Sequence, residues 1–181
     1  MPSLLYLHGF ASCGRGQKST ALAEYFGKEN LLAPDLPYAP DEAIAYLEDL
    51  LASRHFDLLV GSSLGGFYAA WLAEKYAHKA VLLNPSTAPY ETLAPCVGEQ
   101  RRFCDGEIFR FEAACLQQLQ QYVTTPEKGE YLVLLQSGDE VLDYRIAKEK
   151  YRTQRVVVEY GGNHRFENIE DYLSMIGNFT E

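Results

Sequence analysis

The most informative stretch of the chain is Leu58-Leu59-Val60-Gly61-Ser62-Ser63-Leu64-Gly65-Gly66-Phe67-Tyr68-Ala69-Ala70. An apolar strand precedes the pattern G-x-S-x-G, and a helix rich in Ala and aromatic residues follows it. Such a tight strand-turn-helix junction strains the backbone of its central serine, Ser63, and exposes the hydroxyl at the helix N-terminus. Ser62 does not fit the pattern, because Val60 and Leu64 flank it at two residues on either side. The pattern alone also fits a structural Gly-Ser turn.

Apolar strand-like runs alternate with helix-like segments on both sides of this junction. We expect strands at 4–7, 31–33, 56–60, 80–83, 131–135 and 156–160, and helices at 17–28, 41–53, 64–76, 144–151 and 169–179. Asp41 is the candidate N-cap of its helix. Continuously apolar strands that alternate with helices predict a six-stranded, mostly parallel sheet with helices on both faces. Active sites of such sheets lie beyond the carboxyl ends of the strands.

One region interrupts this alternation, since no strand is evident between Asn84 and Glu130. It contains Pro85, Pro89 and Pro95 and a candidate helix at 109–122, and it is too aromatic for a disordered linker. Long insertions in compact domains are usually functional. We interpret about 86–130 as a short cap over the site, within a single domain that spans 1–181.

Two further polar loops follow strands in the order that a Ser-Asp-His triad requires. Asp139 follows the strand at 131–135, and His164 follows the strand at 156–160 in a Gly-rich loop. His164 is therefore the candidate general base for Ser63, and Asp139 the acid that orients it. Asp143 is an alternative acid, but it can instead cap the following helix. His8 precedes the serine, so chain order favours a structural role for it.

The loop after the first strand, His8-Gly9-Phe10, is placed to complete the site. In this fold, the loop after that strand provides one backbone N–H of an oxyanion hole, and the residue after the nucleophile provides the other. These donors would be the N–H groups of Phe10 and Leu64. We assign no substrate-binding side chain from the sequence.

Composition excludes several classes of partner. The 181 residues carry a net charge of -9, which disfavours nucleic acid and a basic membrane anchor. No apolar run approaches the roughly 18 residues of a membrane span, and the N-terminus does not resemble a signal peptide, so we expect a cytoplasmic protein. Arg101 and Arg102 are expected to form an exposed pair. We expect a small-molecule partner.

The cysteines are sparse and their spacing suggests neither zinc nor a CxxC pair. We expect four free thiols, at Cys13, Cys96, Cys104 and Cys115. Cys13 lies near the candidate site and is interpreted as a small buried residue, with an oxidation-sensitive position as the alternative. No metal or organic cofactor is indicated.

Five segments together carry a family resemblance: Leu5-Tyr6-Leu7-His8-Gly9-Phe10, Gly61-Ser62-Ser63-Leu64-Gly65-Gly66, Asn84-Pro85, Gly138-Asp139-Glu140-Val141-Leu142-Asp143-Tyr144-Arg145 and Gly161-Gly162-Asn163-His164. From Leu4 to about Tyr172, the chain resembles the YqiA/YcfP family of small bacterial α/β-hydrolase-fold esterases. The resemblance implies hydrolysis of short acyl esters, with acyl-CoA thioesters as a second option, and it favours Asp139 over Asp143. The segments 11–14 and 86–88 and Arg165 depart from the family pattern, which leaves the substrate open.

The expectation is therefore an α/β-hydrolase-fold serine esterase that acts through an acyl-enzyme. The alternative is a non-catalytic binding module that retains the fold, because a fold alone does not establish activity.

Overall fold

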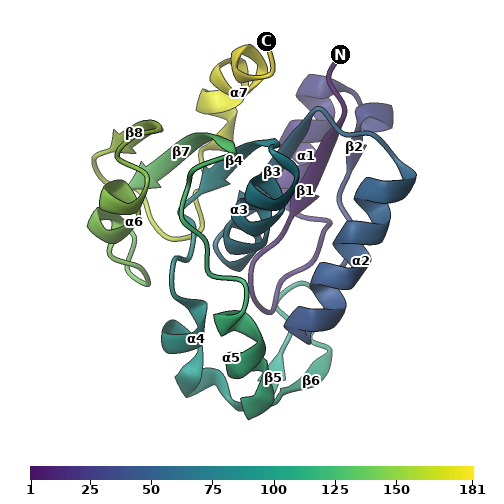
Figure 1. Cartoon of the computed structure of the whole chain (residues 1–181), viewed down its shortest axis with the longest axis vertical. Helices are drawn as coiled ribbons and strands as arrows, with labels where there is room; N and C mark the ends of the chain where they lie inside the picture. The colour runs from purple at the N-terminus through teal and green to yellow at the C-terminus, as the bar shows by residue number, and fades with distance from the viewer.

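The computed structural model describes residues 1–181 and contains one main sheet (Figure 1). Its strands are β1 (Leu4–Leu7), β2 (Leu31–Leu32), β3 (Leu58–Ser62), β4 (Lys79–Leu83), β7 (Glu130–Gln136) and β8 (Arg155–Glu159). Their order is β2-β1-β3-β4-β7-β8 and every neighbouring pair is parallel, which confirms the predicted sheet. The chain reverses its direction of travel across the sheet between β1 and β3. Ligands of open parallel sheets bind at such a switch point.

Helices cover both faces of the sheet. They are α1 (Gln17–Phe26), α2 (Pro40–Ser53), α3 (Leu64–Tyr76), α4 (Pro89–Thr92), α5 (Ala113–Gln120), α6 (Tyr144–Lys150) and α7 (Leu173–Phe179), with short 3-10 turns η1 (Lys28–Asn30), η2 (Ala94–Cys96) and η3 (Ile169–Tyr172). Alternation along β3 places Leu58 and Val60 in a core with α1 and α7, and Leu59 in a second core with α2 and α3. Both faces are therefore buried, which explains the continuously apolar strands.

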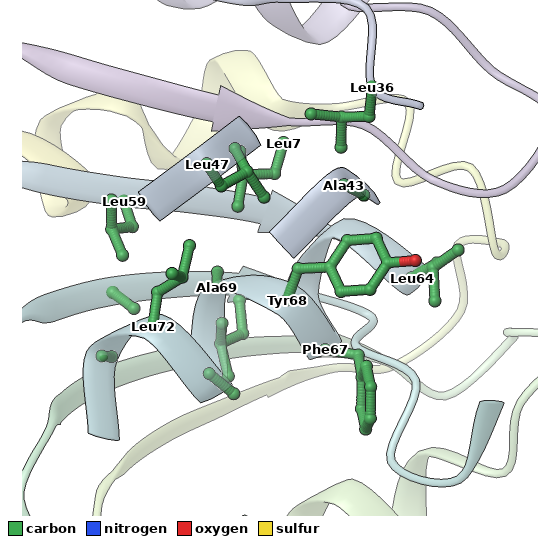
Figure 2. Packing of buried hydrophobic residues seen from close by; sticks show 14 of the residues in the cluster. Leu7, Leu36, Ala43, Leu47, Leu59, Leu64, Phe67, Tyr68, Ala69 and Leu72 are labelled. Carbon is green, nitrogen blue, oxygen red and sulfur yellow. The ribbon is translucent and has the colours of Figure 1, made fainter. Parts of the chain in front are cut away.

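Helix α3 is the best buried helix, since nine of its residues are buried. Figure 2 shows Ala69 and Leu72 of this helix beside Leu59, with Leu47 and Ala43 of α2 close by. This packing fixes the orientation of α3 against one face of the sheet. It thereby also fixes the position of Ser63, the residue immediately before it.

The predicted N-cap of α2 is wrong. The helix begins at Pro40, and Ala39 occupies the N-cap position without a side-chain hydrogen bond. Proline favours the first helical position because its fixed φ suits a helix start. Asp41 lies in the first turn, where its carboxylate accepts a 2.6 Å hydrogen bond from the Tyr122 hydroxyl.

The insertion between β4 and β7 contains two strands that the sequence did not reveal. The segments β5 (Gly98–Arg101) and β6 (Ile108–Phe111) pair as an antiparallel hairpin, so the expectation of no strand there is wrong. In β6, Phe109 and Phe111 are buried while Ile108 and Arg110 are exposed. This short alternation was mistaken for the start of a helix, and α5 begins only at Ala113. Figure 1 shows α4, α5 and the hairpin together at the end of the molecule opposite the two termini.

The expectation of four free thiols is wrong for two of them. Cys13 and Cys104 form a disulfide across 91 residues of sequence, with Cα atoms 6.3 Å apart, inside the usual range for such a bond. Cys96 and Cys115 are free, as expected. The pairing arises because the β5–β6 hairpin folds back onto the loop after β1, a proximity that sequence spacing cannot reveal.

None of the helices combines the length and apolar character that crossing a bilayer would require.

Candidate active site

The turn between β3 and α3 has the strained geometry that its sequence predicts. Ser63 adopts φ +54° and ψ −117°, a region that residues with a side chain rarely occupy. A Cβ at Gly61 would collide with the backbone of Gly65, and a Cβ at Gly65 would collide with the carbonyl of Leu7. The glycines are therefore required for strand and helix to approach, and the turn presents the Ser63 hydroxyl at the N-terminus of α3.

The three candidate triad residues form a hydrogen-bonded series with His164 in the middle. The Oγ of Ser63 is 2.9 Å from Nε2 of His164, and Nδ1 of His164 is 2.8 Å from Oδ2 of Asp139. A carboxylate at Nδ1 favours the tautomer that carries its proton there. Nε2 is then left as an acceptor for the Ser63 hydroxyl, which is the arrangement that a general base needs.

The carboxylate of Asp139 is held rigidly, since its side chain is only 2% exposed. Its Oδ1 accepts hydrogen bonds from the N–H groups of Val141 (2.9 Å) and Leu142 (2.7 Å). Oδ2 thus remains directed at the imidazole. Both oxygens of this buried carboxylate have partners, as burial of a charge requires.

Asp143, the alternative acid, has a different place. It is the N-cap of α6, where it accepts from the N–H of Arg145 at 3.0 Å and pairs with the Arg145 guanidinium at 2.7 Å. This guanidinium lowers the pKa of Asp143. The structure therefore places Asp139, and not Asp143, beside His164.

The loop after β1 lies against the nucleophile turn. A Cβ built on Gly9 would lie 3.3 Å from Cβ and 3.9 Å from Oγ of Ser63, so a side chain at this position would crowd the nucleophile turn. The N–H of Phe10 has no acceptor within the chain. Leu64 is the first residue of α3, where an N–H has no intrahelical acceptor. Two backbone donors are thus free on the two segments that meet at Ser63.

His8 connects this loop to the end of β2. Its Nε2 accepts a 2.9 Å hydrogen bond from the N–H of Leu36, and its Nδ1 lies 2.8 Å from the carbonyl of Gly9. Burial lowers the pKa of His8 and favours the neutral ring that this pattern requires. These contacts agree with the structural role that chain order suggested.

Three side chains that the sequence did not point to hold the His164 loop. Glu140 accepts a 2.9 Å hydrogen bond from the N–H of His164, which lowers the pKa of that carboxyl. Gln136 accepts from the N–H of Asn163 at 3.0 Å, and Asn84 donates to the carbonyl of Asn163 at 3.0 Å. Their signal was a polar residue at or just beyond the end of an apolar strand, which holds for Asn84 and Gln136.

On the other flank of Ser63, the β5–β6 hairpin packs on the loop after β1. Phe10 contacts the rings of Phe109 and Phe111 edge to face, at centroid distances of 5.8 and 5.0 Å. Tyr38 stacks on Phe109 at 3.8 Å. The N–H of Phe103 donates to the carbonyl of Ala11 at 2.8 Å.

The expected exposed pair of arginines is wrong for Arg102. Its side chain is only 16% exposed and pairs with Asp35 at 3.3 Å, with Glu107 at 3.1 Å and with Asp105. Sequence position gave no sign of this, because Asp35 lies in the distant loop after β2. The side chain is therefore part of the contact between hairpin and sheet.

A cavity of about 350 Å³ lies over residues 137–145, beside Asp139 and Glu140, and two further cavities adjoin the site. One of about 200 Å³ lies between α4 and the start of α6, and Pro85, Asp139 and Leu142 are among the residues that line it. The second, of about 20 Å³, lies against the loop after β1, beside Phe10, Leu64 and Tyr68. The first has room for a small organic group, whereas the second has room for about one water molecule.

One cluster of possible metal ligands comprises Cys13, Cys104 and Asp105. The disulfide removes both thiolates, which are the ligand form of cysteine. The carboxylate of Asp105 is paired with Arg102. This cluster is therefore not suited to hold a metal ion in the disulfide-bonded form.

Comparison with known proteins places the chain among related sequences. The model of the family described as "Uncharacterised protein family (UPF0227)" matches residues 3–181. The chain belongs to this family. A UPF0227 protein of Citrobacter koseri is 25% identical over 184 residues, and the UPF0227 protein YcfP of Salmonella paratyphi A is 24% identical over 184 residues. Each alignment covers 97% of both chains, and the resemblance to the YqiA/YcfP family is confirmed.

Solved structures identify the fold of this UPF0227 protein. The mouse alpha/beta hydrolase domain-containing protein 10 superposes with a TM-score of 0.74 at 16% identity, over 98% of this chain and 89% of that one. The esterase domain of a Rhodothermus marinus protein gives 0.69 at 19% identity, over 97% and 83%. The fold is that of the α/β hydrolases, as the sequence predicted.

Proposed function

We propose that this UPF0227 protein is a serine hydrolase that cleaves carboxylic esters through an acyl-enzyme. The observation that carries the proposal is the hydrogen-bonded series from Ser63 through His164 to Asp139, with distances of 2.9 and 2.8 Å. Near neutral pH a serine hydroxyl keeps its proton and is a weak nucleophile, so it needs an adjacent base. Each residue of the series stands where that chemistry needs it.

The reaction follows from these positions. Nε2 of His164 takes the Ser63 proton while Oγ bonds to the ester carbonyl carbon. Asp139 stabilises the imidazolium, and the imidazolium then donates its proton to the departing alcohol. Water repeats the sequence on the acyl-enzyme, which releases the acid and restores Ser63.

The tetrahedral intermediate needs donors for its negative oxygen. The N–H groups of Phe10 and Leu64 take this role, supported by the N-terminus of α3. Because both donors are backbone groups, side-chain substitutions leave them in place. Loss of a donor of this kind typically costs about 10²–10³ in turnover.

The dimensions of the site favour small substrates. The cavity beside the loop after β1 is about 20 Å³ and the cavity between α4 and α6 is about 200 Å³, both below the roughly 300 Å³ at which drug-sized pockets begin. The cavity of about 350 Å³ over residues 137–145 is lined mostly by polar residues and is less suited to an acyl chain. We therefore propose short acyl esters as substrates, with short acyl thioesters as the second option. The insertion at about 86–130 acts as the cap that limits this space.

A fluorophosphonate probe tests the proposal directly, because it labels only an activated serine. Wild type should be labelled and Ser63→Ala should not. Ser62→Ala is the matched control, since it removes the adjacent hydroxyl, and it should be labelled like wild type. Unlabelled wild type, or equal labelling of Ser63→Ala, would refute the proposal and favour the binding module.

Substrate class is tested with p-nitrophenyl esters and acyl-CoA thioesters of graded chain length. We expect kcat/KM to be highest for acetyl or propionyl groups and to fall as the chain lengthens. A maximum at long chains would show that the cap opens further than the cavities suggest.

A further inference from the structure

We propose that Asn84 is a positioning residue that sets the distance between the His164 loop and the Ser63 turn. This inference rests on the proposed hydrolase activity and assigns a role to a residue outside the triad. The relevant segment is residues 83–86, which comprises the last residue of β4 and the start of the connection that follows it. Strand β4 lies between β3 and β7 in the sheet.

The side chain of Asn84 reaches from this segment to the His164 loop. Its Nδ2 donates to the carbonyl of Asn163 at 3.0 Å and makes a longer contact of 3.4 Å to the carbonyl of His164. Its Oδ1 accepts from the N–H of Gln136 at 2.8 Å. The residue is 2% exposed, so these hydrogen bonds have little competition from water.

The backbone of the same segment holds the nucleophile. The carbonyl of Leu83 accepts from the N–H of Ser63 at 3.1 Å, and the N–H of Ser86 donates to the carbonyl of Ser63 at 3.1 Å. The backbone N–H and the carbonyl of Ser63 are thus both hydrogen-bonded to residues 83–86. The proposed donor and acceptor of the proton are therefore fixed to one short segment, with Asn84 on the histidine side.

The chemistry of the amide explains why asparagine suits this position. Two carbonyls face Nδ2 and one N–H faces Oδ1, so the side chain must donate at one end and accept at the other. An aspartate would direct an acceptor at two carbonyls. The backbone of Asn84 also has φ +40°, a conformation that asparagine and glycine tolerate better than other residues.

That backbone conformation is a competing reason for the residue, and the variants separate the two. Asn84→Gly keeps the favourable φ and removes the amide, whereas Asn84→Asp keeps the shape and removes the donor. Asn30→Gly is the matched control, since Asn30 also donates to a main-chain carbonyl, that of Phe26, far from the site.

The readout is ester hydrolysis, with kcat and KM measured separately. We expect both Asn84 variants to lower kcat by about 10- to 100-fold, the loss typical of a displacement of about 1 Å, with KM changed less than about threefold. Asn30→Gly should leave both constants unchanged. An unchanged kcat in Asn84→Gly, or a loss confined to KM, would overturn the positioning role.

A double-mutant cycle with His164→Ala supplies a readout that general destabilisation would not give. If Asn84 acts through His164, Asn84→Gly should slow fluorophosphonate labelling of the wild-type background and leave the slower labelling of His164→Ala unchanged. Equal slowing in both backgrounds would mean that the effect does not pass through His164. Failure of the hydrolase proposal is distinguishable, because wild type itself would then not be labelled.

Discussion

The His164 loop and the Phe10 loop approach Ser63 from the two sides of β3, and they are held by different interactions. The His164 loop is fixed by directional hydrogen bonds from Gln136, Asn84 and Glu140. The Phe10 loop is fixed by edge-to-face aromatic contacts and a disulfide to the β5–β6 hairpin, and Arg102 pairs the hairpin with Asp35 in the loop after β2. Hydrogen bonds fix angles as well as distances, whereas apolar packing mainly fixes volume.

This difference matches what the proposed reaction requires of each loop. The imidazole must meet two partners along defined directions, so small rotations of its loop matter. The Phe10 loop presents one backbone N–H, and its neighbours limit the space around it. Changes on the histidine side should therefore reduce chemistry most, and changes on the hairpin side should reduce stability most.

The largest expected effect tests the histidine side. Asp139→Asn should lower kcat by about 10⁴-fold, because an amide stabilises the wrong tautomer of His164 and does not stabilise its cation. Asp143→Asn is the matched control and should lose little activity, since Asp143 caps α6. Steady-state kinetics on one ester give kcat for both variants. A loss in Asp143→Asn as large as that in Asp139→Asn would contradict the assignment of Asp139 as the orienting acid.

The second prediction tests the hairpin side. Under oxidising conditions, Cys104→Ser should lower the free energy of unfolding by about 2–4 kcal/mol, because the bond closes a long loop in the unfolded chain. Urea unfolding measures the loss, with Cys96→Ser as a control that should change little. Activity at low denaturant should fall far less than in Asp139→Asn. A severe loss of kcat in a folded Cys104→Ser would contradict the division between the two sides.

A smaller effect is expected for the hydrogen bonds around Gln136. Gln136→Leu leaves the partly buried N–H of Asn163 without its acceptor, and Glu159 and Asn168 without their shared donor. Loss of about 2 kcal/mol in the free energy of unfolding follows from such unsatisfied groups. Because the His164 loop loses a support, kcat should fall as well. Stability loss with an unaltered kcat would show that Asn84 and Glu140 suffice.

The smallest effect concerns pH and His8. Burial lowers the pKa of His8, so between that pKa and about 6.5 the unfolded chain binds more protons than the folded one. Stability from this group is complete above about pH 6.5 and falls as the pH drops, by at most about 1.4 kcal/mol per pH unit. His8→Gln should flatten the pH dependence of urea unfolding between about pH 6.5 and 5. Identical pH profiles of wild type and His8→Gln would mean that another group takes up the proton on unfolding.

Much of the fold and of the candidate site could be predicted from the sequence because the relevant patterns are local. The predicted bounds of α3, 64–76, match the structure, and the glycines around Ser63 report a turn that no larger residue permits. Chain order pointed to Asp139 and His164, and the structure places His164 beside Ser63 and Asp139 beside His164. Features of this kind depend on residues that are close together in one segment of the chain.

The features that were missed depend on contacts between distant segments. Cys13 meets Cys104, and Asp35 meets Arg102, only because a hairpin folds across the end of the sheet. Gln136 was hidden differently, since it ends an apolar strand and appears in the sequence as an isolated polar residue. Its partners Asn163 and Asn168 lie on another segment.

The strained backbone of Ser63 has a consequence for the history of the chain. Conformations of this kind cost on the order of 1–3 kcal/mol in a residue with a side chain, and glycine largely avoids that cost. A descendant that no longer used the hydroxyl would therefore become more stable by a single serine-to-glycine replacement. In copies that do not use the hydroxyl, mutational drift should favour glycine at this position.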